Sequence, residues 1–216
     1  MAINVNKRSR GRPRQFELED AIQVGQHLFH EHGYENVSVA SLTGAIGITA
    51  PSFYTAFGSK SAFFNDALRH YSATVVPLDA LLIPGTSPQI ALLNMLKAAA
   101  HAYAEHPQRR GCFILEHAKA GATEAGTAAK QIADENRARV MAFLEGSGIS
   151  AASQVTDYVS VTMLGLSAAA KEGWEEKRLL ATVETAAVGL AQLIESAQAA
   201  PTGTAPPDFL VGTKKE

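Results

Sequence analysis

The sequence has very little cysteine and tryptophan: one residue of each among 216, the cysteine being Cys112. A single cysteine excludes an internal disulfide framework and fits a reducing compartment, so we expect a cytoplasmic protein. There is also no run of about eighteen uncharged apolar residues, so the sequence predicts neither a membrane-spanning helix nor a membrane partner. The basic N-terminus lacks a following apolar segment, so no secretory signal is expected.

The motifs that position a nucleophile, a phosphate or a metal in common enzyme families are missing from the sequence. Two sets of polar residues have a helical spacing that could place metal ligands on one face: His27, His30 and Glu31, and His101, Glu105 and His106. No further ligand cluster follows at a recognisable spacing, so we interpret both sets as solvated polar faces. The sequence therefore predicts no catalytic residue, no metal site and no cofactor, and the protein is not expected to be an enzyme.

Acidic residues are absent from the first fourteen positions, which hold five basic ones: Lys7, Arg8, Arg10, Arg12 and Arg14. The formal net charge is −2, so the rest of the chain stands at −7. We expect residues 1–14 to be a disordered arm that contacts DNA through Arg10, Arg12 and Arg14. The run RGRPR is similar to an AT-hook core, which lies in a narrow A·T minor groove; a sequence-blind phosphate-binding tail is the alternative.

Residues 38–57 read as two short helices joined by a tight turn. The first would begin after Ser38 as N-cap and end at Gly47, a residue that tolerates positive φ. Thr49 would cap the second helix, with Pro51 in its first turn. The expected inward faces are Val39, Leu42, Ala45 and Ile46 in the first helix and Phe53 and Phe57 in the second. This pattern predicts a helix-turn-helix, whose second helix lies in the DNA major groove.

The flanking segments carry a wider resemblance. A basic arm ending RGRPRQF, a first helix ending HGYENVS, the core LTGAIGITAPSFYTAF and a fourth helix opening with GSKSAFF occur in this order. Over residues 11–71 the chain resembles the DNA-binding domain of the TetR family of transcriptional regulators. The resemblance implies phosphate contacts from Ser38, Tyr54 and Lys60. The expected groove-facing residues are Ala50, Ser52, Tyr54 and Thr55, next to the capping Thr49.

The predicted fold is all-α, with a three-helix helix-turn-helix head joined by a fourth helix to a larger helical domain for effector binding and dimerisation. Helices are expected at about 17–32, 59–71, 87–107, 111–120, 123–144, 153–171 and 177–198, with a linker at 76–88. Leu18, Ala21, Ile22, Leu28 and Phe29 would form the buried stripe of the first helix. The expected units are the arm at 1–14, the DNA-binding domain at 15–58, the larger domain at 59–199 and a disordered tail at 200–216.

The last two helices are rich in small residues, including Gly165, Ala169, Ala186 and Gly189. Small residues let helices approach closely, and the family resemblance implies that these helices form a four-helix bundle between two subunits. Ordinary packing within one chain is the alternative. The family also implies an effector pocket, for which the aromatic and methionine candidates are Met95, Tyr103, Phe113, Met141, Tyr158, Met163 and Trp174, although each is also an ordinary core residue.

The sequence thus predicts a homodimeric DNA-binding regulator, a repressor rather than an activator, that binds a palindromic operator and is released by a small molecule. The second helix lacks the Arg, Lys, Asn and Gln side chains that read bases bidentately, so the operator sequence is open. One alternative is a redox- or electrophile-sensing repressor, in which Arg109, Arg110 and a helix N-terminus favour the Cys112 thiolate. Another is an architectural protein that coats A·T-rich DNA.

Overall fold

The computed structural model describes residues 14–199, with side chains described from 18 to 198, and this part of the chain is all-helical without strands. The all-α prediction is confirmed. In chain order the helices are α1 (Arg14–His32), α2 (Val39–Ile46), α3 (Ala50–Phe57), α4 (Lys60–Thr74), α5 (Leu78–Leu81), α6 (Pro88–Ala104), α7 (Phe113–Ala118), α8 (Glu124–Gly146), α9 (Ala152–Lys171) and α10 (Glu176–Ala199).

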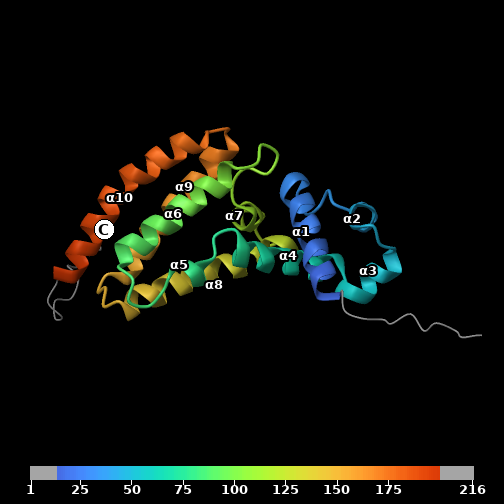
Figure 1. Cartoon of the computed structure of the whole chain (residues 1–216), viewed down its shortest axis with the longest axis horizontal. Helices are drawn as coiled ribbons and strands as arrows, with labels where there is room; N and C mark the ends of the chain where they lie inside the picture. The colour runs from blue at the N-terminus through green and yellow to red at the C-terminus, as the bar shows by residue number, and fades with distance from the viewer. Residues whose placement is uncertain (1–13, 200–216) are drawn as a thin grey trace, which may run out of the picture.

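The molecule is elongated, with a small head of α1, α2 and α3 at one end and the long helices α6, α8, α9 and α10 at the other (Figure 1). Helix α4 packs against α1 in the head and against α8 in the body, and α7 packs against both α4 and α8. The head is therefore joined to the body through α4, with the short α7 beside that connection.

The head is held together by a cluster of phenylalanine rings. Phe29 of α1, Phe53 of α3 and Phe63 of α4 are fully buried, and the Phe63 ring lies 5.1 Å from that of Phe53 and 6.2 Å from that of Phe29. Phe64, the next residue of α4, packs edge-on against Phe29 with the ring centroids 5.1 Å apart. Burying such rings stabilises a fold by about 1.5–3 kcal/mol each, so a few aromatic residues hold three short helices on α4.

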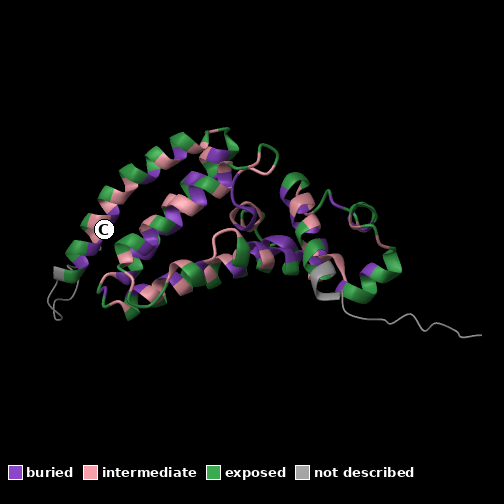
Figure 2. Ribbon diagram, in the orientation of Figure 1, coloured by how far each residue is buried: buried purple, intermediate pink, exposed green. Residues whose placement is uncertain are grey.

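The body is a bundle in which α6 packs against α9 and α10. Fully buried Leu92 and Leu96 of α6 and Val183 and Leu190 of α10 belong to its core, and Figure 2 shows buried residues along the facing sides of these helices. By length and composition alone, helix α10 could cross a membrane over Glu176–Gln198, and 22% of its most apolar window is buried. The segment contains charged residues, so it did not meet the stricter sequence criterion of about eighteen uncharged apolar residues. Val188 of this helix is 70% exposed.

Several local predictions differ from the structure. Helix α1 begins at Arg14, so the last residue of the predicted arm belongs to a helix, and the predicted linker contains the one-turn α5. Leu18 is 39% exposed and Ala45 is exposed, so neither belongs to the buried stripe in which it was expected. The buried position on α2 beside Leu42 is Thr43, whose hydroxyl donates to the Ala40 carbonyl and so satisfies its own hydrogen bond.

Candidate DNA-binding surface and effector cavity

Helices α2 and α3 and the turn between them have local hydrogen bonds that fix their ends. The Ser38 hydroxyl accepts from the Ser41 backbone N–H (3.0 Å) while the Ser41 hydroxyl accepts from the Ser38 N–H (2.9 Å), which is a capping box. Gly47 ends α2 with φ +78°, a conformation that a side chain would strain. Thr49 then caps α3, its hydroxyl accepting from the Ser52 N–H at 3.4 Å.

Burial divides α3 into two faces. Phe53 and Phe57 point into the head, and the opposite side is exposed. The exposed residues include all the predicted groove-facing ones: Ala50, Ser52, Tyr54 and Thr55. Their polar groups are largely hydroxyls, and the Thr55 hydroxyl donates to the Pro51 carbonyl at 2.8 Å. The face thus offers small apolar groups, hydroxyls and one phenol to a partner, with no charge of either sign.

The nearest described cation to this face in the sequence is Lys60, the first residue of α4. Its Nζ lies 4.0 Å from the centroid of the Tyr34 ring, a cation–π contact. The Tyr34 ring in turn packs on Phe64 with centroids 4.9 Å apart. Lys60 is therefore held at the start of a helix, where the partial positive charge of the helix also favours an anion.

Other predicted DNA contacts differ in their surroundings. Ser38 is exposed, but its hydroxyl already bonds within the capping box, and Tyr54 is 51% exposed. Arg10 and Arg12 lie outside the described residues. Arg14 begins α1, and its side chain lies outside the described part as well. The structure thus brings Thr49 and the α3 face together on one side of the head.

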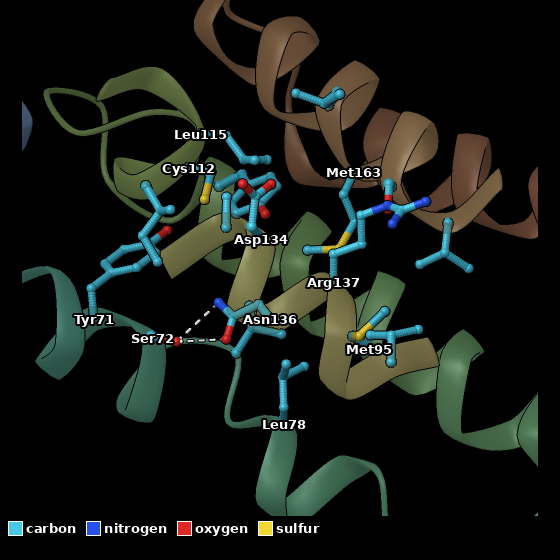
Figure 3. Close-up of a pocket in the computed structure, with 18 residues that line it drawn as sticks. Tyr71, Ser72, Leu78, Met95, Cys112, Leu115, Asp134, Asn136, Arg137 and Met163 are labelled. Atoms are coloured by element: carbon cyan, nitrogen blue, oxygen red, sulfur yellow. Dashed lines mark hydrogen bonds between the residues drawn. The ribbon is translucent and has the colours of Figure 1, made fainter. Parts of the chain in front are cut away.

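The body contains a cavity of about 230 Å³ lined by residues of α4 to α9 (Figure 3). Apolar side chains form most of its wall. The lining residues are Tyr71, Ser72, Val76, Leu78, Met95, Tyr103, Cys112, Ile114, Leu115, Ala133, Asp134, Asn136, Arg137, Val140, Val159, Ser160, Met163 and Leu164. Its polar groups lie mainly on α8, where Asn136 and Ser72 of α4 bond to each other through both side chains (3.0 and 3.1 Å). The cavity therefore has an apolar interior and a polar α8 side.

Three of the predicted pocket residues, Met95, Tyr103 and Met163, line this cavity. The other four do not, which corrects the prediction. Phe113 is packed between Tyr71 and His30. Tyr158 donates a hydrogen bond to the Ala186 carbonyl (2.8 Å), and Trp174 lies under the guanidinium of Arg178. Met141 is half-buried elsewhere on α8. Ser72, Asn136 and Val140 were missed, because only the packing of α8 on α4 brings them to one space.

Cys112 caps α7 and lies against the cavity, near Tyr71 in Figure 3. Burial raises the pKa of its thiol, and nearby backbone N–H groups and tyrosine hydroxyls offset only part of this rise. Arg110 is turned elsewhere: it donates to the Trp174 carbonyl at 2.9 Å and lies 3.9 Å from Glu175. Cys112 thus lies at a helix N-terminus as predicted, but Arg110 does not face the sulfur, and desolvation is the largest influence on the thiol pKa.

A buried histidine joins the head to the cavity wall. The His30 ring lies edge-on to Tyr71 (centroids 5.9 Å) and tilted against Phe113 (5.4 Å), and its Nε2 has no hydrogen-bond partner among the described residues. Burial, with the charges of Lys171 and His117, lowers the pKa of His30 to about 3, so the imidazole is neutral. No group of three or more potential metal-ligating side chains occurs within the described part of the chain.

The predicted dimer residues have unequal surroundings. Gly165 is exposed, and a Cβ there would meet nothing within 4 Å. A Cβ on Gly189 would instead lie 2.8 Å from the Tyr158 hydroxyl, so its small size serves packing within the chain. Ala186 and Ala169 are half-buried, and Ala186 accepts the Tyr158 hydrogen bond. The alternative of intrachain packing therefore applies to Gly189 and Ala186.

An exposed, uncharged α3 face on a capped helix-turn-helix, carried by a helical body with a cavity, defines a DNA-binding transcriptional regulator. Residues 21–67 match the family described as bacterial regulatory proteins, tetR family. The chain is 34% identical over 196 residues to the HTH-type transcriptional repressor BdcR of Escherichia coli strain K12, covering 90% of this chain and 100% of that protein. The chain belongs to the TetR family.

Other comparisons agree with this assignment. The chain is 30% identical over 128 residues to the HTH-type transcriptional repressor ComR of the same organism, covering 58% of this chain and 61% of that protein. Its structure is similar to that of a cysteine mutant of the TetR family regulator CifR, which was solved with a 26-base-pair double-strand operator DNA. That similarity has a TM-score of 0.67 at 29% identity and covers 82% of this chain and 98% of the CifR chain.

Proposed function

We propose that this protein is a cytoplasmic homodimeric repressor, without enzymatic activity, that binds a palindromic operator and leaves it when a small molecule enters the body cavity. The observation that carries the proposal is the exposed α3 face on a rigidly capped helix-turn-helix. BdcR and ComR, which the chain resembles, are repressors by name, and the CifR structure holds operator DNA.

The α3 face supports a particular kind of DNA recognition. Ala50 and the methyl group of Thr55 suit thymine methyl groups, and hydroxyls can donate to or accept from base edges. A face without charge supplies little of the affinity, so phosphate contacts must come from elsewhere. Lys60, at the start of α4, is the described residue best placed for such a contact, with the basic residues 1–14 as the second source.

Dimerisation is supported by the apolar residues that α9 and α10 leave uncovered. Val161 is 67%, Leu164 41% and Val188 70% exposed, which is unusual for large apolar side chains gathered on two neighbouring helices. Gly165 lies beside Leu164 without a neighbour of its own. A second subunit packed here would cover these residues and place two helix-turn-helix units on one duplex.

A coupling between the cavity and the DNA-binding face is supported by α4. One end of this helix carries Phe63 and Phe64 of the head core, and the other end carries Tyr71 and Ser72 of the cavity wall. His30 and Phe113 pack on Tyr71 from the head and from α7. A molecule that displaces Tyr71 would therefore shift the packing between α1 and α4, on which the position of α3 depends.

Footprinting of the purified protein on DNA upstream of its own coding region tests this proposal. We expect protection of one discrete site with two-fold symmetry, lost when the matching metabolite is added. Uniform protection of A·T-rich DNA would favour the architectural alternative and overturn the proposal. Turnover of a candidate metabolite by the same preparation would overturn the non-enzymatic assignment.

A further inference from the structure

The cavity wall contains one buried polar group that lies near the Cys112 thiol but makes no geometric hydrogen bond to any described residue. Four buried side-chain nitrogen or oxygen atoms lack a hydrogen-bond partner in the described part of the chain, and the Tyr103 hydroxyl oxygen is the one that belongs to a cavity-lining residue. Tyr103 is fully buried on α6. A buried hydroxyl without a partner destabilises the protein, and a ligand that accepts a hydrogen bond from it would remove that cost.

Burial raises the pKa of the Tyr103 phenol well above its ordinary value. The hydroxyl is protonated at neutral pH, as an ordinary phenol is, so this cavity-lining residue carries a hydrogen-bond donor without a partner. Apolar side chains such as Met95, Val159 and Met163 line the space around it. The interior thus combines an apolar wall with one unoccupied donor.

The charged and polar residues on the α8 side of the cavity already have partners. Asp134 accepts from Lys130 at 2.7 Å, and Arg137 forms an ion pair with Asp157. Asn136 is bonded to Ser72, as Figure 3 shows with dashed lines. A charged ligand would thus find no free counter-charge among the described lining residues, and burying an unpaired charge is strongly unfavourable.

The volume sets a further limit. A dry apolar cavity of about 150 Å³ holds benzene, so the 230 Å³ present here accommodates a single ring with a short substituent. Because the cavity is partly open to the surface, the parts of a larger ligand would lie outside this space. Shape, charge and the free donor therefore all restrict the ligand.

We propose that the effector is a neutral, mainly apolar molecule of one-ring size that carries a single hydrogen-bond-accepting oxygen, and that Tyr103 is the residue that recognises this oxygen. The inference rests on the proposed function, since it names the ligand class of that regulator. It concerns reversible binding and involves no covalent step at Cys112.

Three probes of the same shape separate the contributions. Acetophenone has a ring and an accepting carbonyl, α-methylstyrene replaces that oxygen by a methylene group, and benzoate replaces the acetyl group by a charged carboxylate. Calorimetric titration of the full-length protein should show acetophenone binding about 5- to 10-fold more tightly than α-methylstyrene, as one hydrogen bond to a buried donor would produce. Benzoate should bind more weakly than either.

Tyr103→Phe removes only the hydroxyl and should abolish the preference for acetophenone, while α-methylstyrene binding is kept. Tyr71→Phe is the matched control. It also removes a hydroxyl from the cavity wall. This hydroxyl lies near the Cys112 thiol, as that of Tyr103 does, but it also lies near the Phe113 backbone N–H and is not among the buried atoms without a partner. In Tyr71→Phe the preference should remain at about 5- to 10-fold.

Several results would overturn the inference: an unchanged preference in Tyr103→Phe, its loss in Tyr71→Phe instead, tightest binding of benzoate, or no binding of any probe. If Tyr103→Phe does not fold, the ranking of the three probes on the unmodified protein still tests the ligand class. A gel-shift measurement on the upstream DNA with the same preparations separates this inference from the proposed function. Retained operator binding without probe binding contradicts only the inference, whereas probe binding without operator binding contradicts only the function.

Discussion

The Phe63 ring of α4 lies directly against the backbone of Gly25 in α1, so that a Cβ on Gly25 would come within 2.2 Å of Phe63 Cε1. This contact sets how closely α1 and α4 approach. We predict that Gly25→Ala lowers the free energy of unfolding, because over-packing costs about 1–3 kcal/mol and exceeds the gain of at most about 1 kcal/mol in helix propensity. Urea denaturation followed by circular dichroism measures the change.

Gly44→Ala is the matched control for this prediction. Gly44 is exposed in α2, and a Cβ there meets nothing within 4 Å, so alanine should stabilise by up to about 1 kcal/mol. Equal changes in the two variants would show that the Phe63 contact does not limit the approach of the helices.

The second prediction separates the two glycines near the proposed dimer interface. Gly165→Leu should weaken the dimer and leave the stability of the subunit nearly unchanged, because only a second subunit would meet the new side chain. Gly189→Leu should destabilise the subunit itself through the Tyr158 hydroxyl 2.8 Å away. Sedimentation gives the association state and thermal melting the stability. A monomeric unmodified protein at micromolar concentration would contradict the dimer.

The third prediction concerns pH. His30 has a pKa of about 3 in the fold against an ordinary 6.5, so below pH 6.5 the unfolded chain binds a proton that the folded chain does not. The free energy of unfolding should therefore keep its full value above pH 6.5 and fall by about 1–3 kcal/mol as the pH drops to 4.5. His117, whose pKa is also lowered by burial, acts in the same direction. Thermal melts across this range measure the loss, and His30→Leu should reduce it.

His101→Gln controls for histidine titration in general. A hydrogen bond to Glu176 raises the pKa of this exposed side chain, so its small contribution is present below pH 6.5 and is lost as the pH rises. The fall in stability between pH 6.5 and 4.5 should thus be unchanged in His101→Gln. If His30→Leu keeps the full fall in stability, the buried imidazole is not its source.

The fourth prediction addresses Lys60. If its ammonium contacts phosphate, Lys60→Ala should weaken binding to operator and random DNA alike and reduce the salt slope by about one unit. Tyr34→Leu, which removes the ring that holds Lys60, should weaken both kinds of DNA less. Thr55→Ala is the contrasting variant and should change the preferred sequence. Fluorescence anisotropy at several salt concentrations distinguishes them, and identical behaviour of Lys60→Ala and Thr55→Ala would contradict the assignment.

The fifth prediction concerns Cys112, the residue of the redox alternative. Because burial raises the pKa of its thiol, alkylation by iodoacetamide at pH 7 should be at least about tenfold slower than that of free cysteine. Quinone treatment should release operator DNA equally from the unmodified protein and from Cys112→Ser. Rapid alkylation together with loss of release in Cys112→Ser would restore the sensing hypothesis.

The head was largely predictable from the sequence because its signals are local. Ser38, Gly47 and Thr49 act within their own turns, so residue type alone indicates the caps that the structure has. Leu18 and Ala45 were assigned wrongly because helical periodicity gives a face but not its edges, and those edges depend on which neighbouring helix arrives.

The cavity was much less predictable. Its wall combines Tyr71, Tyr103, Cys112 and Val140, which come from four separate segments, and no spacing in the sequence links them. Phe113 and Trp174 were attractive candidates by residue type, yet each is used for packing outside the cavity. The surroundings of Cys112 were missed for the same reason, since desolvation is a property of the assembled body.

The exposed α3 residues and the cavity-lining residues form two sets without a common member. Substitutions at Thr55 and at Met163, for example, change surfaces that never touch the same ligand. Mutation can therefore alter the DNA site in one lineage and the inducing molecule in another without a compromise between them. Descendants of such a protein can acquire new target genes and new signals separately, provided that the aromatic contacts of α4 are kept.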